Sequence, residues 1–262
     1  KFTSFILSLP FKALPPAKAD CVIIVRDSEM VNGTYVLARQ AGLQPRFADP
    51  TKRLPDSRVY FLPDAKGRAF LTLRRWDELK ARVRDEGATL AIEWNDTFLP
   101  DHEEVFGAEI ESRTPGRPVF RPISAEALET DKSGNPCFMR NRYGKGTVYL
   151  LTRPVSALAN GKTGGFDSDA WRYYATACPK KLLVEDGARD VTVSEHPFAD
   201  GTVAVILVNN SSRPHSSKPA IASGWTVAGS LTDDASAAEW KDGALRLDGN
   251  AGILLMLRKG DR

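Results

Sequence analysis

Three carboxylate side chains stand where a parallel sheet would bring them together. Each comes directly after an apolar run that predicts a strand: Asp27, Asp64 and Asp96. In open α/β sheets, ligands bind outside the carboxyl ends of the strands. Carboxylates with an aromatic ring beside them can hold a sugar by hydrogen bonding and stacking. The sequence therefore predicts a substrate-binding or interface edge built from Asp64, Glu93, Trp94, Asn95 and Asp96.

The same residues also have a purely structural interpretation. Asp27 can cap the helix that follows it, and Asp64 and Asp96 can be turn residues whose carboxylates bond their own backbone. Trp94 can equally be a core residue. The sequence is compatible with both interpretations.

Common catalytic motifs are absent from the sequence. The turn after the first predicted strand reads Arg26-Asp-Ser-Glu29, which lacks the glycines that a dinucleotide pyrophosphate needs. No G-x-S-x-G elbow occurs. The three histidines lack metal-ligand spacing and are expected to be structural or solvated: His102, His196 and His215. We therefore predict no cofactor and no metal site.

The stretch 59–96 predicts the element that would position these side chains. Two apolar runs, 59–62 and 89–94, flank a segment with apolar residues at helical spacing. Thr72 is a candidate N-cap of that helix, and Gly87 stands where a C-cap glycine belongs. The result is a βαβ unit, which requires a parallel sheet covered on both faces.

The remaining elements of the first part can be arranged around this unit. The patterns predict strands at 20–25 and 44–48, helices at 29–40, 99–106 and 167–177, an edge strand within 113–123, and a hairpin of 136–141 with 147–151. From about Lys180 the alternation ends, and short strands separated by turn residues predict a small β-sandwich. We therefore expect an N-terminal lead-in segment at 1–19, an α/β domain at 20–180 and a β-sandwich domain at 181–262.

Composition and charge narrow the function classes. The chain has 262 residues and a net charge of +3, from 36 basic and 33 acidic side chains that are interleaved. A nucleic-acid footprint needs a clustered basic face, so no nucleic-acid partner is predicted. No apolar stretch reaches the roughly 20 residues of a membrane span. Three widely spaced cysteines predict neither a disulfide framework nor a metal site. Lys1 opens directly onto an apolar run, and we expect it to continue a longer polypeptide.

Scaffold motifs carry a resemblance to a known family. They are the L-x-x-W-x-x-L helix leading to G-A-T-L, the R-Y-G-K-G-x-V-Y-L hairpin, and the H-P-x-x-D-G-x-V opening of the β-domain. Over residues 20–260 the chain resembles the C-terminal part of bacterial clan-A glycoside hydrolases. There, a class-I glutamine-amidotransferase-like domain of the β-galactosidase trimerisation type precedes a small β-sandwich. The resemblance implies a flavodoxin-like, mostly parallel sheet with helices on both faces.

The resemblance also implies an accessory role. The turn that would carry an amidotransferase nucleophile reads Leu62-Pro63-Asp64-Ala65 and holds no cysteine. We therefore expect the domain to lack amidotransferase activity. Members of the clan place their acid/base after an Asn, and no Asn-Glu pair occurs here. We therefore predict no catalytic residue in this chain. The expected partners are an upstream (β/α)₈ barrel and further copies of the chain.

Two alternatives remain open. The β-domain could be a carbohydrate-binding module that stacks sugar rings on Trp225 and Trp240, with an oligosaccharide or polysaccharide as partner. The chain could also be a free-standing hydrolase that uses its strand-end carboxylates.

Overall fold

A computed structural model describes residues 11–26, 28–67, 70–113, 118–156, 159 and 169–260. The chain divides into two compact units. One is the α/β unit, residues 19–179, and the other joins residues 180–262 to the N-terminal residues up to 18. The described part of the N-terminal segment therefore belongs to the β unit. From the sequence, this segment was expected to be separate from both domains.

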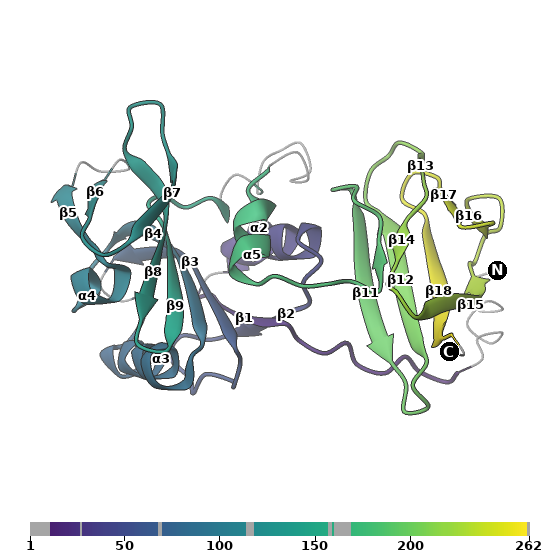
Figure 1. The fold of residues 1–262 in the computed structure, drawn as a ribbon, viewed down its shortest axis with the longest axis horizontal. Helices are drawn as coiled ribbons and strands as arrows, with labels where there is room; N and C mark the ends of the chain where they lie inside the picture. Colours follow the sequence, from purple (N-terminus) through teal and green to yellow (C-terminus); the bar gives the residue numbers. More distant parts are fainter. Residues whose placement is uncertain are drawn as a thin grey trace. The chain divides into compact units, whose positions relative to one another are not determined.

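A seven-stranded sheet organises the α/β unit (Figure 1). Its order is β2 (Pro45–Ala48), β1 (Cys21–Ile24), β3 (Val59–Gly67), β4 (Thr89–Thr97), β9 (Gly146–Leu151), β8 (Pro136–Tyr143) and β7 (Glu126–Thr130). The first five strands pair in parallel, and β8 and β7 are antiparallel. The mostly parallel sheet predicted from the sequence is confirmed.

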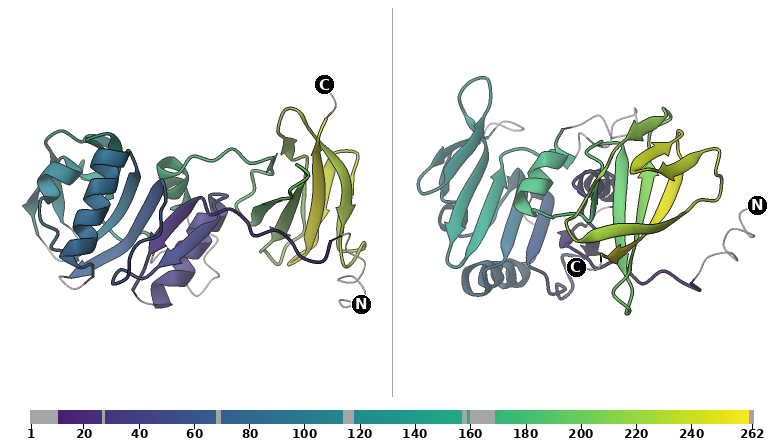
Figure 2. Two further views of the ribbon diagram at one scale, coloured as in Figure 1. Left: turned by 90° about the horizontal axis from the view of Figure 1, so that it is seen from below. Right: turned by 45° about the vertical axis from the view of Figure 1, so that its right-hand side comes forward.

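Helices cover both faces of this sheet, as its continuous apolar strands require (Figure 2). Trp76, Leu79 and Val83 of α3 (Leu73–Glu86) are buried with the side chains of one sheet face. On the other face, α2 (Ser28–Gln40) supplies Leu37, and α5 (Trp171–Ala177) supplies Tyr174. The short helix α4 (His102–Phe106) joins the α3 side.

The ends of α3 follow from local chemistry. The Thr72 hydroxyl accepts a hydrogen bond from the backbone N–H of Arg75 at 3.3 Å. At the other end Gly87 adopts a left-handed φ of 78°, and its N–H returns to the carbonyl of Val83 at 3.2 Å. Both caps predicted from the sequence are confirmed.

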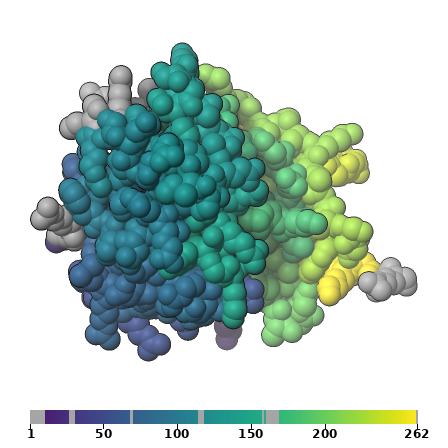
Figure 3. All heavy atoms as spheres, turned by 60° about the vertical axis from the view of Figure 1, so that its left-hand side comes forward, coloured from purple at the N-terminus to yellow at the C-terminus, as the bar shows by residue number. Residues whose placement is uncertain are grey.

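The β8–β9 hairpin lies against the end of α3. A Cβ at Gly146 would lie 2.2 Å from the carbonyl oxygen of Ala88 and 2.5 Å from that of Val83. At Gly144, a Cβ would lie 2.4 Å from the carbonyl oxygen of Arg84. Glycine is needed at both positions because backbone meets backbone there. The blue and teal residues of this unit form a continuous surface in Figure 3.

Several predicted elements have different bounds. The predicted helix at 99–106 begins only at His102, and the described part of the helix predicted at 167–177 begins at Trp171. The strand expected within 113–123 is β6 (Val119–Pro122), which pairs with β5 (Ala108–Ser112) outside the main sheet. Strand β7 was not predicted, because its residues are mostly polar and only one side of it is paired.

The β unit is built from antiparallel sheets. One has the order β11 (Val191–Pro197), β12 (Val203–Asn209), β18 (Gly252–Lys259) and β15 (Trp225–Leu231). Another has the order β13 (His215–Ser217), β17 (Ala244–Leu247) and β16 (Ala238–Lys241), and β10 (Val184–Glu185) pairs with β14 (Ala220–Ile221). Inward side chains of these strands share one apolar core, which confirms the sandwich.

Candidate functional site at the carboxyl ends of β3 and β4

The candidate site lies where β3 and β4 run past two β-bulges. Leu62 pairs with Ile92 and Ala65 pairs with Trp94, so Pro63 and Asp64 together oppose the single residue Glu93. The sequence interpretation that the strand ends at Leu62 is therefore wrong. Proline usually stops a central strand, but a bulge accommodates its missing donor and lets pairing resume.

The second bulge is on the neighbouring strand. Lys66 pairs with Asn95 and Gly67 pairs with Thr97, which leaves Asp96 as the extra residue of β4. The segment 95–97 is thus part of a strand, and its interpretation as a loop is wrong. Asp64 and Asp96, the two bulge aspartates, have left-handed φ values of 46° and 49°. Aspartate tolerates this region better than most residues, which explains this residue type at both bulges.

The two bulge aspartates have different surroundings. Asp64 is half-buried, and its carboxylate accepts a hydrogen bond from the side-chain amide of Asn95. Asp96 is exposed on the same edge. The structure therefore brings Asp64 and Asn95 together, as predicted for neighbouring strand ends.

Glu93 has a fully enclosed carboxyl group. Its Oε2 accepts hydrogen bonds from the Ser156 backbone N–H at 3.1 Å and the Ser156 hydroxyl at 2.7 Å. Its Oε1 accepts one from the Tyr174 hydroxyl at 3.2 Å. The backbone N–H of Asp64 also bonds to this carboxyl group. All four donors belong to the protein, so the carboxyl group is satisfied without solvent.

Burial dominates the acidity of Glu93. Removal from water raises the pKa of its carboxyl group from 4.5 to about 7, although the hydrogen bonds from Ser156, Tyr174 and Asp64 act in the opposite direction. The pKa of the Tyr174 phenol is raised well above 10, first by burial and then by the facing carboxylate. The carboxyl group of Glu93 can therefore change its protonation state near neutral pH.

A cavity beside Glu93 is too small for a sugar. Its volume is about 10 Å³, and its walls include Phe61, Pro63 and Tyr174. A cavity needs at least ~10 Å³ to hold one water molecule. The enclosed carboxyl group therefore has room beside it for a single water and not for a substrate.

Trp94 points to the opposite face of the sheet. Its side chain is 2 % exposed, and its ring makes edge contacts with Phe106 at 6.0 Å and Phe120 at 5.4 Å. His102 lies 6.0 Å away on α4. Within this chain Trp94 is a core residue, which agrees with the structural alternative stated for it.

The two tryptophans proposed for sugar stacking belong to the β unit. Trp225 on β15 and Trp240 on β16 are both half-buried and pack against its apolar core. Part of each ring is therefore committed to packing.

The remaining predicted residues are Asp27 and two histidines of the β unit. Asp27 lies outside the described residues. His196 and His215 bond within the β unit, to Pro15 and Asp186 respectively. Within the described ranges, no group of three or more His, Cys, Asp or Glu side chains is arranged to hold a metal ion. Of the described helices, none has the length and apolar character to cross a membrane.

Sequence reasoning missed Ser156 and Tyr174 as partners of the strand end. Ser156 lies 63 positions and Tyr174 81 positions from Glu93 in the sequence. The available signal was Glu93 itself, because a carboxylate inside an apolar strand needs donors nearby. Phe61 stacks on Tyr174 with a centroid distance of 4.4 Å, which holds the phenol against the strand end.

Comparisons with known proteins give matches in structure only. No family model matches the sequence, and neither does any curated protein. A beta-galactosidase from Rahnella sp. R3 is 15% identical, with a TM-score of 0.63 over 93% of this chain and 41% of that one. Gan42B, a GH42 beta-galactosidase from G. stearothermophilus, is 14% identical, with a TM-score of 0.61 over 92% and 40%. An alpha-L-fucosidase from Paenibacillus thiaminolyticus is 8% identical, with a TM-score of 0.57 over 94% and 49%.

The lengths in these comparisons are unequal. The chain is matched almost end to end, but it spans only about two fifths of the beta-galactosidases. At this coverage the match includes residues of both units. The chain therefore has the fold of a part of the GH42 beta-galactosidases, which confirms in fold the resemblance to glycoside hydrolases inferred from its sequence.

Proposed function

We propose that this chain is the accessory part of a glycoside hydrolase of the β-galactosidase, β-mannanase or endoglucanase type, acting in carbohydrate degradation. In this proposal a (β/α)₈ barrel supplies the catalytic carboxylates. The chain packs on that barrel, contributes to an oligomer, and lines one side of the substrate cleft with the edge that carries Asp64, Asn95 and Asp96.

The coverage of the structural matches carries the proposal. Beta-galactosidases match more than nine tenths of the chain with less than half of their own length. A separate observation supports the division of labour. Glycoside hydrolysis needs two carboxyl groups on either side of the sugar, whereas Glu93 is sealed and its cavity holds at most one water.

The decisive experiment measures hydrolysis by the chain alone and by a longer polypeptide. We expect the 262-residue chain to leave nitrophenyl β-glycosides intact, and a product of the same gene that includes an upstream barrel to hydrolyse them. Turnover by the isolated chain that is abolished in the double variant Asp64→Asn, Asp96→Asn would refute the accessory role and establish the free-standing hydrolase.

Affinity electrophoresis on gels that contain polysaccharides distinguishes the accessory role from the alternative, a carbohydrate-binding module. The accessory role predicts no retardation of the isolated chain. Retardation that disappears in Trp225→Ala or Trp240→Ala would instead support a stacking platform, and circular dichroism would show whether each variant remains folded.

A further inference from the structure

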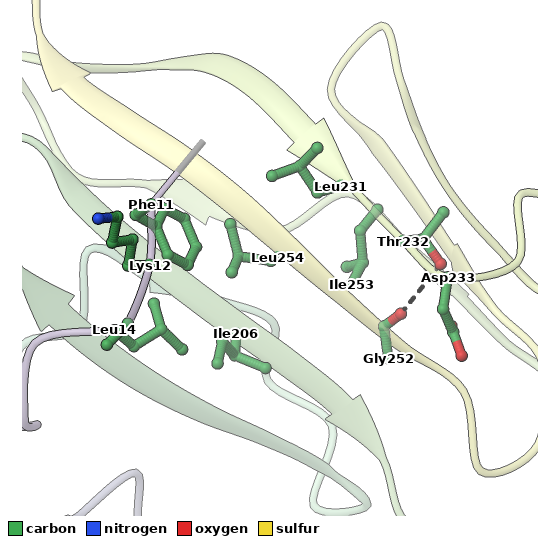
Figure 4. A pocket seen from close by; sticks show the side chains of 11 residues that line it. Phe11, Lys12, Leu14, Ile206, Leu231, Thr232, Asp233, Gly252, Ile253 and Leu254 are labelled. Atoms are coloured by element: carbon green, nitrogen blue, oxygen red, sulfur yellow. Dashed lines mark hydrogen bonds between the residues drawn. The ribbon is translucent and has the colours of Figure 1, made fainter. Parts of the chain in front are cut away.

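Two hollows on the β unit differ in chemistry. One has a volume of about 370 Å³, and its walls are formed largely by the apolar side chains of Phe11, Ile206, Leu231 and Leu254 (Figure 4). The other has a volume of about 650 Å³ and lies on the sheet of β13, β17 and β16. We call this second hollow the charged groove, because it is lined by the charged side chains of Lys218, Lys241, Arg246, Glu239 and Asp242.

The charged groove occupies the outward face of its sheet. Leu245 of β17 enters the apolar core, and its neighbours Ala244 and Arg246 point outward, because side chains alternate along a strand. Lys241 of β16 pairs with Ala244, and Lys218 follows the end of β13 on the other side of β17. Since neighbouring strands are ~4.8 Å apart, the backbones of the two lysines are roughly 10 Å apart. The small side chain of Ala244 leaves the space between them open.

Arg246 forms a fixed wall of the groove. Its guanidinium group donates hydrogen bonds to the carboxylate of Asp248 at 2.9 Å and to the carbonyl of Ser236 at 2.7 Å. Its Nε lies 4.0 Å from the carboxylate of Glu239. The charge of Arg246 is therefore already balanced by its neighbours, and its position is set without a ligand.

Lys218 and Lys241 differ from Arg246 in this respect. Both are exposed, and within the part of the chain that the structure describes neither ammonium group takes part in a hydrogen bond or an ion pair. Two uncompensated positive charges on either side of a hollow are complementary to a ligand with negative groups. A preformed hollow also lowers the cost of ordering such a ligand.

The remaining lining indicates what else this ligand carries. The hydroxyl of Ser216 and the carboxylate of Asp242 are exposed in the groove and can bond hydroxyl groups. The carboxylate of Asp242 would repel a ligand made of carboxylates alone. Among the described residues that line the groove none has an aromatic ring, so stacking on a neutral sugar contributes nothing here.

We propose that the charged groove binds an acidic carbohydrate, a sugar chain that bears carboxylate groups. Lys218 and Lys241 pair with its carboxylates, and Ser216 and Asp242 bond its hydroxyl groups. The choice of a carbohydrate rests on the proposed function, whereas the choice of a negatively charged one rests on the groove itself.

The test measures binding of tetragalacturonate to the full chain by isothermal titration calorimetry. Lys218→Gln, Lys241→Gln should raise the dissociation constant about tenfold, the effect of losing two exposed ion pairs. The matched control Lys181→Gln, Lys259→Gln removes the same charge from two exposed lysines of the β unit that do not line the groove, and should bind like the wild type. Ala244→Leu fills the hollow without a change of charge and should also weaken binding.

Two further ligands and one gel separate this site from others. The neutral methyl ester of tetragalacturonate and the peptide tetraglutamate should both bind at least about tenfold more weakly than tetragalacturonate. The accessory role alone predicts no retardation on polysaccharide gels, and the groove adds one exception. Polygalacturonate should retard the chain, and the retardation should persist in Trp225→Ala and Trp240→Ala.

Several results would overturn the proposal. They are the absence of tetragalacturonate binding, equal weakening in the two lysine double variants, unchanged binding in Ala244→Leu, and equal binding of the methyl ester or of tetraglutamate. Circular dichroism of each variant confirms that a loss of binding is not a loss of fold. Because hydrolysis is not measured, failure of this proposal leaves the accessory role untouched, and that role fails only by the turnover experiment described for it.

Discussion

The hydroxyl of Tyr174 on α5 donates a hydrogen bond to the carboxyl group of Glu93 at the carboxyl end of β4, at a distance of 3.2 Å. This contact ties a helix near the end of the α/β unit to its central βαβ element. It also places an acid with a pKa of about 7 in an enclosed site. The stability of the unit should therefore depend on pH in a defined direction.

Glu93→Gln tests this dependence. The pKa of Glu93 is higher in the folded chain than in the unfolded chain, so the folded state binds the proton more tightly. The contribution of Glu93 to the free energy of unfolding should therefore be greatest below pH 4.5. It should decrease as the pH rises toward 7 and above. Across this pH range, the change in the free energy of unfolding that Glu93 causes is on the order of 3 kcal/mol. Urea unfolding between pH 4.5 and 8.5 should show this slope in the wild type and lose it in Glu93→Gln; an unchanged slope would contradict the assignment.

Trp94→Ala separates a core tryptophan from a cleft residue. Because the ring is buried among Phe106 and Phe120, its removal should lower the free energy of unfolding by about 3–5 kcal/mol. The control is Phe98→Ala, whose side chain is 54 % exposed and should cost less than about 1 kcal/mol. Chemical denaturation measures both, and similar small losses would mean that Trp94 is not part of the core.

Gly146→Ala tests the close approach of the hairpin to α3. The added methyl group would collide with two carbonyl oxygens, so the backbone must shift, at a cost of about 1–3 kcal/mol or more. Gly229→Ala is the matched control because nothing lies within 4 Å of its added Cβ. Thermal unfolding should show a lowered midpoint for the first variant only. Equal midpoints would mean that the hairpin does not rest on the helix end.

Thr72→Ala removes the N-cap of α3. The variant should lose about 1 kcal/mol, because the Arg75 N–H loses its acceptor at the start of the helix. Thr72→Ser keeps a hydroxyl oxygen and should unfold at nearly the wild-type urea concentration. A loss of the same size in Thr72→Ser would assign the effect to packing of the methyl group.

Replacement of Asp96 tests whether the left-handed backbone conformation accounts for the presence of aspartate at this position. At a φ of 49°, glycine should be at least as stable as aspartate, whereas Asp96→Ala should cost about 1–2 kcal/mol. Urea unfolding of the two variants provides the measurement. If both variants unfold like the wild type, the left-handed conformation does not constrain the position.

The parts that sequence reasoning predicted correctly depend on local signals. The caps of α3 require only Thr72 and Gly87 at the proper distance from an amphipathic segment. The glycines at 144 and 146 likewise mark the β8–β9 hairpin. The bulges were missed because Pro63 and Asp64 look like the end of a strand, and only the neighbouring strand reveals that pairing continues. Among the candidate residues, Glu93 is enclosed by Ser156 and Tyr174, which lie 63 and 81 positions away in the sequence. Short-range sequence patterns do not encode contacts between residues so far apart.

The two bulges cancel in register. Leu62 pairs with Ile92 before the bulges, and Gly67 pairs with Thr97 after them. The two partners are equally far apart in the sequence in both pairs, because β3 and β4 each carry one extra residue. Loss of Asp64 alone would shift the distal part of β3 by one residue and turn its side chains to the opposite face. Loss of both bulge aspartates would leave the pairing intact as two regular strands. Length changes at this edge are therefore tolerated in pairs, one in each strand, which limits how insertions and deletions can remodel it during evolution.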